Sequence, residues 1–94
     1  MTEHLGGVSK RTERGRAVWR YHGRLIAREL DHAHIVIRTG FGDRKALLLE
    51  YPQTFSITPQ FLRHMMIVAD LDSGDEEAIA GALAAARDLQ AAAE

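Results

Sequence analysis

The segment WRYHGRLIAREL, residues 19–30, carries an arginine at every fourth position. Arg20, Arg24 and Arg28 share one parity of the chain, and the other parity holds mostly apolar or aromatic residues. Because successive side chains of a β-strand point to opposite faces, this pattern predicts a strand with one apolar face and one basic face. The guanidinium group is planar and donates hydrogen bonds in a fixed fork that suits phosphate oxygens. The pattern therefore favours the binding of an acidic, phosphate-bearing ligand.

Five further basic residues extend this pattern toward both ends of the segment. The net charge of −1 hides a gradient: residues 1–28 carry seven Lys and Arg against two acids, whereas residues 70–94 carry seven acids against one Arg. Such a gradient favours nucleic acid or another acidic partner for the front of the chain. The candidate nucleic-acid contacts are Arg20, Arg24, Arg28, Arg38, Lys10, Arg11, Arg14 and Arg16.

The arginine row also fits a simpler arrangement, a solvated outer sheet face on which arginines pair with Glu13, Glu29 or Asp31. The nearby aromatic residues do not decide between the two. Trp19 and Tyr21 could stack on unpaired bases. Their parity is opposite to that of the arginines, however, so we expect them to pack under the final helix.

Other chemistries find little support in the sequence. The chain has no cysteine, which excludes disulfides and thiolate chemistry. His32 and His34 lie two residues apart, but two imidazoles without a third ligand do not make a metal site. The acids of residues 70–77 cluster where a helix begins, and the helix dipole favours them there. No serine or threonine stands at a recognisable spacing from a base. We therefore expect a non-enzymatic protein with no catalytic residue, no metal and no cofactor.

The strands and helices that position the arginines can be predicted from the spacing of apolar residues and from residues typical of turns. Residues 1–17 hold three of the eight glycines and almost no large apolar residue, which predicts a flexible basic arm. A strand is expected from about Val18 to Leu30, with Gly23 as a bulge or a point of close approach. DHAH then reads as a tight turn, and HIVIRTG as a second strand that pairs Leu30 with Val36. In this register, Arg38 joins the basic face.

In the second half of the chain, the spacing of the apolar residues changes. Residues 43–51 predict a short helix capped by Asp43 and ended by Pro52. TFSITP reads as a third strand, and HMMIVADL as a central strand covered on both faces. The clearest element is a helix over 75–92, with an apolar stripe and a capping box between Ser73 and Glu76.

Together these elements predict the α+β fold class: an antiparallel sheet of about four strands, with a short helix (about 43–51) and a long C-terminal helix (about 75–92) packed on one face. Ninety-four residues suffice for one domain, over 18–94 behind the arm 1–17. The chain has no run of about 18 apolar residues and no apolar signal segment. We therefore expect no membrane partner and a cytoplasmic location.

Three segments resemble the MmcQ/YjbR-like family. They are the strand motif Gly23–Ala27, the spacing Pro52, Phe55, Thr58 and Pro59, and the apolar strand 65–71 followed by the helix 75–92. The family is a small α+β domain with a fold like that of CyaY (frataxin), described as a double-wing and predicted to bind DNA. The resemblance covers roughly residues 18–92. Family members usually open with a helix, which residues 1–17 do not offer, so this helix is expected to be shortened or missing.

The function expected from these observations is weak, sequence-tolerant DNA binding through the basic strand face. The alternative is a protein-interaction module or a homodimer, whose basic face docks an acidic partner. A third option is a small-molecule pocket between the sheet and the final helix.

Overall fold

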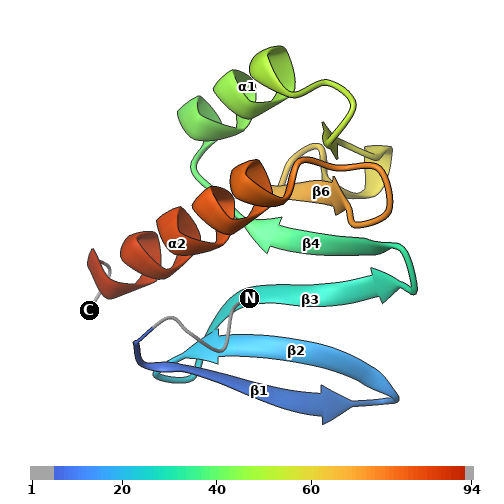
Figure 1. Ribbon diagram of the computed structural model, residues 1–94. Coiled ribbons are helices and arrows are strands. Elements are labelled where there is room, and N and C mark those ends of the chain that lie inside the picture. The colour runs from blue at the N-terminus through green and yellow to red at the C-terminus, as the bar shows by residue number, and fades with distance from the viewer. Residues whose placement is uncertain (1–5, 93–94) are drawn as a thin grey trace.

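The computed structural model describes residues 6–92 and shows an α+β fold with one six-stranded antiparallel sheet (Figure 1). The chain begins as a meander of four strands and ends with a long helix. The elements in chain order are β1 (Val8–Glu13), β2 (Arg16–Tyr21), β3 (Arg24–Asp31), β4 (His34–Arg38), α1 (Phe41–Glu50), β5 (Phe55–Ser56), the 3-10 turn η2 (Pro59–Phe61), β6 (Met66–Asp70) and α2 (Glu76–Ala92). The order in the sheet is β1-β2-β3-β4-β6-β5. The α+β class is confirmed, but the sheet has six strands rather than about four.

Two tight turns account for most of this difference. Arg14 and Gly15 both have positive φ, 56° and 79°, and so have His22 and Gly23, at 48° and 83°. A two-residue turn with two positive φ angles is the type I′ turn, whose twist matches that of a hairpin. The segment 18–30 is therefore divided between β2 and β3, and Gly23 lies in a turn rather than in a bulge. Residues 8–13, which we assigned to a flexible arm, form the edge strand β1.

The main core lies between the sheet and α2, which packs against β3 and β4 (Figure 1). Ile35 and Ile37 point to this face from β4, and Ile79 and Leu83 meet them from α2. The two pairs show the two periodicities that the sequence predicted, two residues in the strand and about four in the helix. Burying each large aliphatic side chain contributes about 1.5–3 kcal/mol. Beside this core a hollow of about 340 Å³ lies between α1 and α2. The small-molecule pocket considered above stays a prediction.

The opposite face of the sheet carries a second, smaller core. Val36 and Val68 project from β4 and β6, and Phe61 of η2 covers them. Both faces of β6 are therefore buried, as the apolar run of residues 64–71 predicted. The segment that carries Phe61 is fastened by Arg44 of α1, whose guanidinium group donates to four backbone carbonyls of residues 61–66.

A bulge in β3 changes which arginines share a face. Trp19 pairs with Ala27, but Arg20 pairs with Leu25, so Ile26 is an extra residue. Both Ile26 and Ala27 are fully buried. Because directly opposite residues point to the same side, the bulge places Arg24 beside Tyr21, on the α2 side of the sheet. Our expectation that Arg24 lies with Arg20 and Arg28 is therefore wrong.

The register between β3 and β4 also differs from the expected one, by two residues. Val36 pairs with Arg28 rather than with Leu30, because Asp31 and His34 close a tighter turn and leave Leu30 bulged. A shift of two residues preserves the faces of the strand. Arg38, two residues beyond Val36, therefore keeps the parity of Arg28.

The helix boundaries lie close to the predicted ones, with different caps. Gly40 rather than Asp43 precedes α1, and Asp43 lies in the first turn. At α2 the Asp75 carboxylate accepts the Ala78 N–H at 3.0 Å, so Asp75 caps the helix. The Ser73 hydroxyl donates instead to Asp70. Within residues 6–92, neither helix is long and apolar enough to cross a lipid bilayer.

Candidate phosphate-binding face

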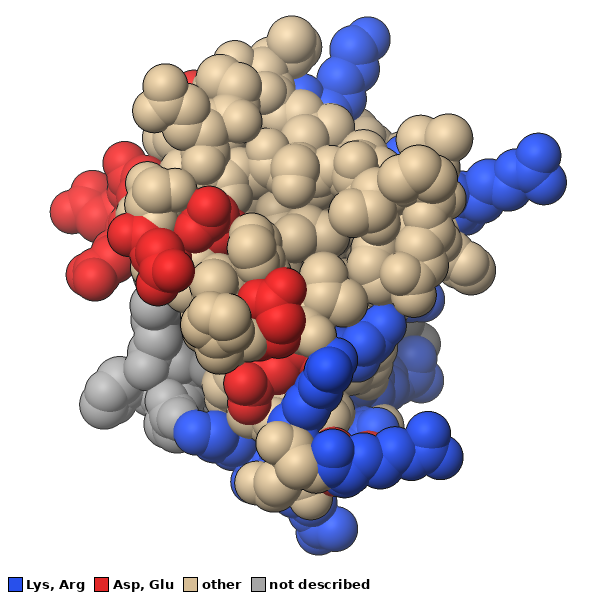
Figure 2. All heavy atoms as spheres, turned by 90° about the vertical axis from the view of Figure 1, so that its right-hand side faces the viewer, with Lys and Arg blue, Asp and Glu red and all other residues tan. Residues whose placement is uncertain are grey.

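Charged side chains are segregated on the surface of the molecule. Figure 2 shows the side at which the β1–β2 and β3–β4 turns lie. Many lysine and arginine side chains lie in the lower part of this view, at the level of β1 and β2, others lie at its upper right, and acidic side chains gather at the centre and left. On this side of the molecule, a basic region therefore lies around the first three strands, and acidic side chains lie mainly apart from it.

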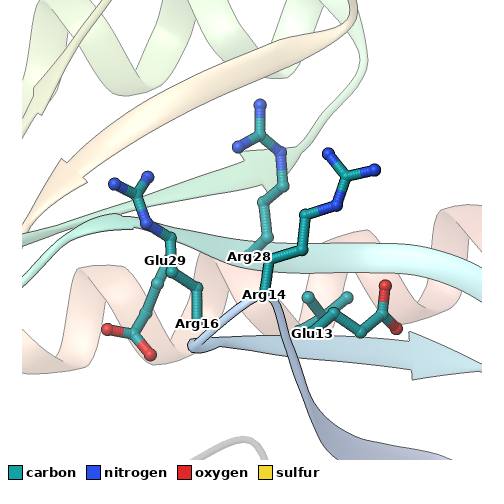
Figure 3. A pocket seen from close by; sticks show the side chains of 6 residues that line it. Glu13, Arg14, Arg16, Arg28 and Glu29 are labelled. Carbon is teal, nitrogen blue, oxygen red and sulfur yellow. The ribbon is translucent and has the colours of Figure 1, made fainter.

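A hollow of about 590 Å³ lies within this basic region, and we call it the basic hollow. Its charged lining comes from the β1–β2 turn and from β3. Figure 3 shows that the side chains of Arg14, Arg16 and Arg28 extend in one common direction, whereas the carboxylate of Glu29 points the opposite way. The lining residues are Glu13, Arg14, Arg16, Val18, Arg28 and Glu29.

Strand pairing explains why three arginines distant in sequence meet here. The two-residue turn brings Arg16 back beside Glu13, and leaves Arg14 at the tip of the hairpin. Val18, two residues after Arg16, pairs with Arg28 of β3. The floor of the hollow is therefore Val18, which is 7% exposed, with guanidinium groups around it.

The arginines of the hollow have no carboxylate partner within residues 6–92. Arg16 donates to the backbone carbonyl of Leu30. The Arg28 guanidinium carbon lies 5.6 Å from the centre of the Phe61 ring, a cation–π contact that leaves its N–H groups available. The Glu29 carboxylate accepts the Ala17 N–H at 2.6 Å, so it is occupied by the backbone. With three arginines and two glutamates in its lining, the hollow carries a net charge of +1.

A second hollow of about 290 Å³ continues the same face along β1 and β2. It shares Glu13 and Val18 with the basic hollow. Arg20 forms an ion pair with Glu13, in which Arg20 Nη2 lies 3.3 Å from Oε1 and Nη1 contacts Oε2. This hydrogen bonding lowers the pKa of Glu13 and raises that of Arg20. The lining residues are Ser9, Arg11, Glu13, Val18, Arg20 and Gly23.

The structure gathers five of the eight candidate residues on this face and separates the other three. Lys10 lies on the α2 side, with its Nζ 5.7 Å from the centre of the Trp19 ring. Arg24 lies on the same side, for the reason given above. Arg38 keeps the parity of Arg28 but pairs with Met66 beside the second core, and it lines neither hollow. The five residues of the face, which we call the basic face, are Arg11, Arg14, Arg16, Arg20 and Arg28.

Two apolar residues of the site were not anticipated as functional. The sequence predicts Val18 only as the approximate start of a strand, and it predicts no role for Phe61. Phe61 follows Pro59 by two residues, a spacing that indicates a turn but not which ring would lie beneath an arginine. That contact depends on pairing between distant segments, so no local sequence pattern predicts it.

The structure also shows what surrounds the histidines that were considered as ligands. His34 Nδ1 lies 2.9 Å from Asp31 Oδ1, and its Nε2 lies 3.9 Å from Asp70 Oδ2. These contacts raise the pKa of His34, chiefly through the hydrogen bond to Asp31. Over the described part of the chain, no three His, Asp or Glu side chains are grouped so that they could hold a metal ion.

Comparison with known proteins adds no family to this picture. The chain matches no protein-family model, no curated protein sequence and no solved structure. The resemblance to the MmcQ/YjbR-like family therefore stays a prediction. The geometry of the basic face is what bears on the function of the chain.

Proposed function

We propose that this chain is a non-enzymatic module that binds DNA weakly, through contacts of the basic face with the phosphate backbone. The observation that carries this proposal is the common direction of Arg14, Arg16 and Arg28 around one hollow, while Glu29 points away and accepts a backbone N–H (Figure 3). A phosphate at this place would meet three guanidinium groups that form no ion pair with a carboxylate of residues 6–92. The predicted DNA-binding character of the MmcQ/YjbR-like family agrees with the proposal.

The chemistry of the face favours backbone contacts over base recognition. Guanidinium groups bind phosphate oxygens in the same way whatever the base, and phosphate contacts position a protein without reading sequence. Each contact with duplex DNA releases about one counterion, so affinity falls steeply with salt. Three to five contacts would give a slope of about −3 to −4.5 in a plot of log K against log salt. We therefore expect low affinity, little sequence preference and strong salt dependence.

Fluorescence anisotropy of a labelled duplex and a labelled single strand tests the proposal, at about 50 and about 200 mM salt. The test variant carries Arg14→Gln, Arg16→Gln and Arg28→Gln. The matched control carries Arg24→Gln, Lys45→Gln and Arg63→Gln, which removes the same charge without touching either hollow. We expect the test variant to lose at least tenfold in affinity and the control to lose much less.

Two results would contradict the proposal. Absence of binding by the unmodified chain at the lower salt concentration would exclude a phosphate-binding role. Equal losses in both variants would show that net charge alone governs binding, and that the basic hollow has no special part in it.

The separation of charge favours a second candidate, self-association. The acidic start of α2, with Asp75, Glu76 and Glu77, is exposed, and the basic face on the same molecule is exposed in part. Two copies could therefore meet with opposite charges facing each other. Sedimentation velocity at low and high salt, without any ligand, separates this candidate from DNA binding: only self-association gives a larger species that salt dissociates.

A further inference from the structure

Glu13 occupies a special place on the basic face, because it lines both hollows. Its direct partner across the strands is Arg16, yet its carboxylate turns toward Arg20, four residues further along β2. Arg16 donates to the Leu30 carbonyl instead. The carboxylate of Glu13 therefore lies along the strip that joins the two hollows, rather than at the edge of the face.

The contact between Glu13 and Arg20 uses both oxygens and both terminal nitrogens. This is the two-pronged geometry in which arginine also binds phosphate. A phosphate group can use this fork of Arg20 only after the carboxylate has left it. A nucleic-acid backbone that passes from one hollow to the other must also cross a negative charge.

We infer that Glu13 is an internal competitor for phosphate, which occupies Arg20 and confines the binding of DNA to the basic hollow. This inference rests on the proposed function of the same face. It identifies the ligand as a backbone with several phosphates that spans both hollows once Glu13 is displaced. It also makes Glu13 the residue that sets how tightly the chain holds DNA.

Replacement of Glu13 by Gln is expected to strengthen the binding of DNA, whereas most substitutions on a binding face weaken it. Glutamine keeps the size of the side chain but removes the charge, so Arg20 becomes available to a phosphate. We expect the Glu13→Gln variant to bind a single-stranded oligonucleotide about three- to tenfold more tightly at about 50 mM salt, with one additional counterion released. Glu77→Gln is the matched control, because it removes one exposed negative charge from α2, outside both hollows. The control is expected to change affinity by much less.

A double-mutant cycle distinguishes competition for Arg20 from a general change in charge. The cycle uses the unmodified chain, Glu13→Gln, Arg20→Gln and the double variant, all measured by anisotropy with the same oligonucleotide. If Glu13 acts by occupying Arg20, its removal has a large effect only when Arg20 is present. The gain in affinity should therefore shrink toward that of the control in the Arg20→Gln background.

The outcomes separate the inference from the function on which it rests. If the unmodified chain binds and Glu13→Gln does not bind more tightly, the inference is overturned and the proposed function stands. An equal gain in the Arg20→Gln background, or in Glu77→Gln, also overturns it. If neither the unmodified chain nor Glu13→Gln binds at low salt, the proposed function itself fails. Thermal unfolding of each variant verifies that the fold is intact, which the surface position of the Glu13 side chain leads us to expect.

Discussion

The guanidinium group of Arg28 lies 5.6 Å from the centre of the Phe61 ring. The two residues belong to β3 and to η2, which are far apart in the sequence. Phe61 is only 4% exposed and closes the second core over Val36 and Val68. One aromatic ring thus buries an apolar face of the sheet and orients an arginine of the basic hollow, so the stability of the fold and the geometry of the site are linked there.

Replacement of Phe61 by Leu should weaken both properties. The smaller side chain removes the cation–π contact, worth about 0.5–1 kcal/mol at a partly exposed site. It also leaves part of the second core unfilled, at a cost of about 1–3 kcal/mol in the free energy of unfolding. Urea denaturation measures the second effect, and anisotropy with labelled DNA measures the first. Leu62→Ala is the control, because Leu62 is 58% exposed and its replacement should change neither quantity. A loss of stability in the Phe61→Leu variant without any loss of affinity would show that Phe61 does not orient Arg28.

Replacement of Arg44 by lysine should clearly lower the stability of the fold. Its guanidinium group donates to the carbonyls of His64 at 2.7 Å and Leu62 at 3.1 Å, with longer contacts to those of Phe61 and Met66. A lysine ammonium is a compact charge without the planar fork, so it would leave several of these carbonyls without a donor. We expect Arg44→Lys to lower the free energy of unfolding by about 1–3 kcal/mol, measured in urea.

The neighbouring Lys45 offers the reverse substitution as a control. The side chain of Lys45 is exposed, so Lys45→Arg should leave stability within about 0.5 kcal/mol. Equal stability of Arg44→Lys and the unmodified chain would show that the carbonyl contacts contribute nothing net to folding.

The elements that carry a strong local pattern are those that the sequence predicts well. The helix over 75–92 is found as α2 (Glu76–Ala92), because its apolar stripe, its acidic first turn and its alanine content all favour the same structure. The apolar run of residues 64–71 contains β6, which both cores bury. In α2, burial repeats at the helical period of the apolar residues, and in β6 burial is continuous, as the apolar run is.

The elements that were not predicted depend on pairing or on weak turn signals. β1 has no buried residue to reveal it, and it exists because β2 offers an edge for hydrogen bonding. The turns at Arg14–Gly15 and His22–Gly23 lack the Asn or Asp that usually marks a type I′ turn. The bulge at Ile26 lies opposite the step from Trp19 to Arg20, and the alternation of residue types does not predict it. The arginines were foreseen as a basic face, but which of them meet depends on this register.

The stability of the chain should depend on pH through His34. Hydrogen bonding to Asp31 raises the pKa of His34 above its ordinary value of 6.5, so this stabilisation is complete below 6.5 and is lost as pH rises through the raised value. The pKa of Asp31 is lowered by the same bond, and that of Asp70 by hydrogen bonds from Ser73. Stabilisation by these two carboxylates is present above 3.8 and is lost as pH falls through their lowered values. The three contributions together are therefore greatest between 3.8 and 6.5.

A His34→Gln variant isolates the histidine part of this dependence. Urea unfolding of both proteins at about pH 5.5 and about pH 8 gives the comparison. We expect the unmodified chain to gain more stability at the lower pH than the variant does, by a modest amount, because all three side chains are partly exposed to water. Identical pH dependence in the two proteins would show that His34 does not bridge the two carboxylates in solution.

Two glycines should respond in opposite directions to the same substitution. A Cβ atom at Gly74 would lie 2.1 Å from the Asp70 carbonyl oxygen, and 3.0 Å from the side chains of Thr54 and Ile79. Gly74→Ala must therefore displace the loop before α2, and we expect a loss of about 1–3 kcal/mol in the free energy of unfolding. Gly81 lies within α2, is exposed and has no atom within 4 Å of an added Cβ, so Gly81→Ala should gain about 0.5–1 kcal/mol from helix propensity. Thermal unfolding of the two variants is the measurement, and a stabilising Gly74→Ala would mean that this loop is not held against Asp70 as described.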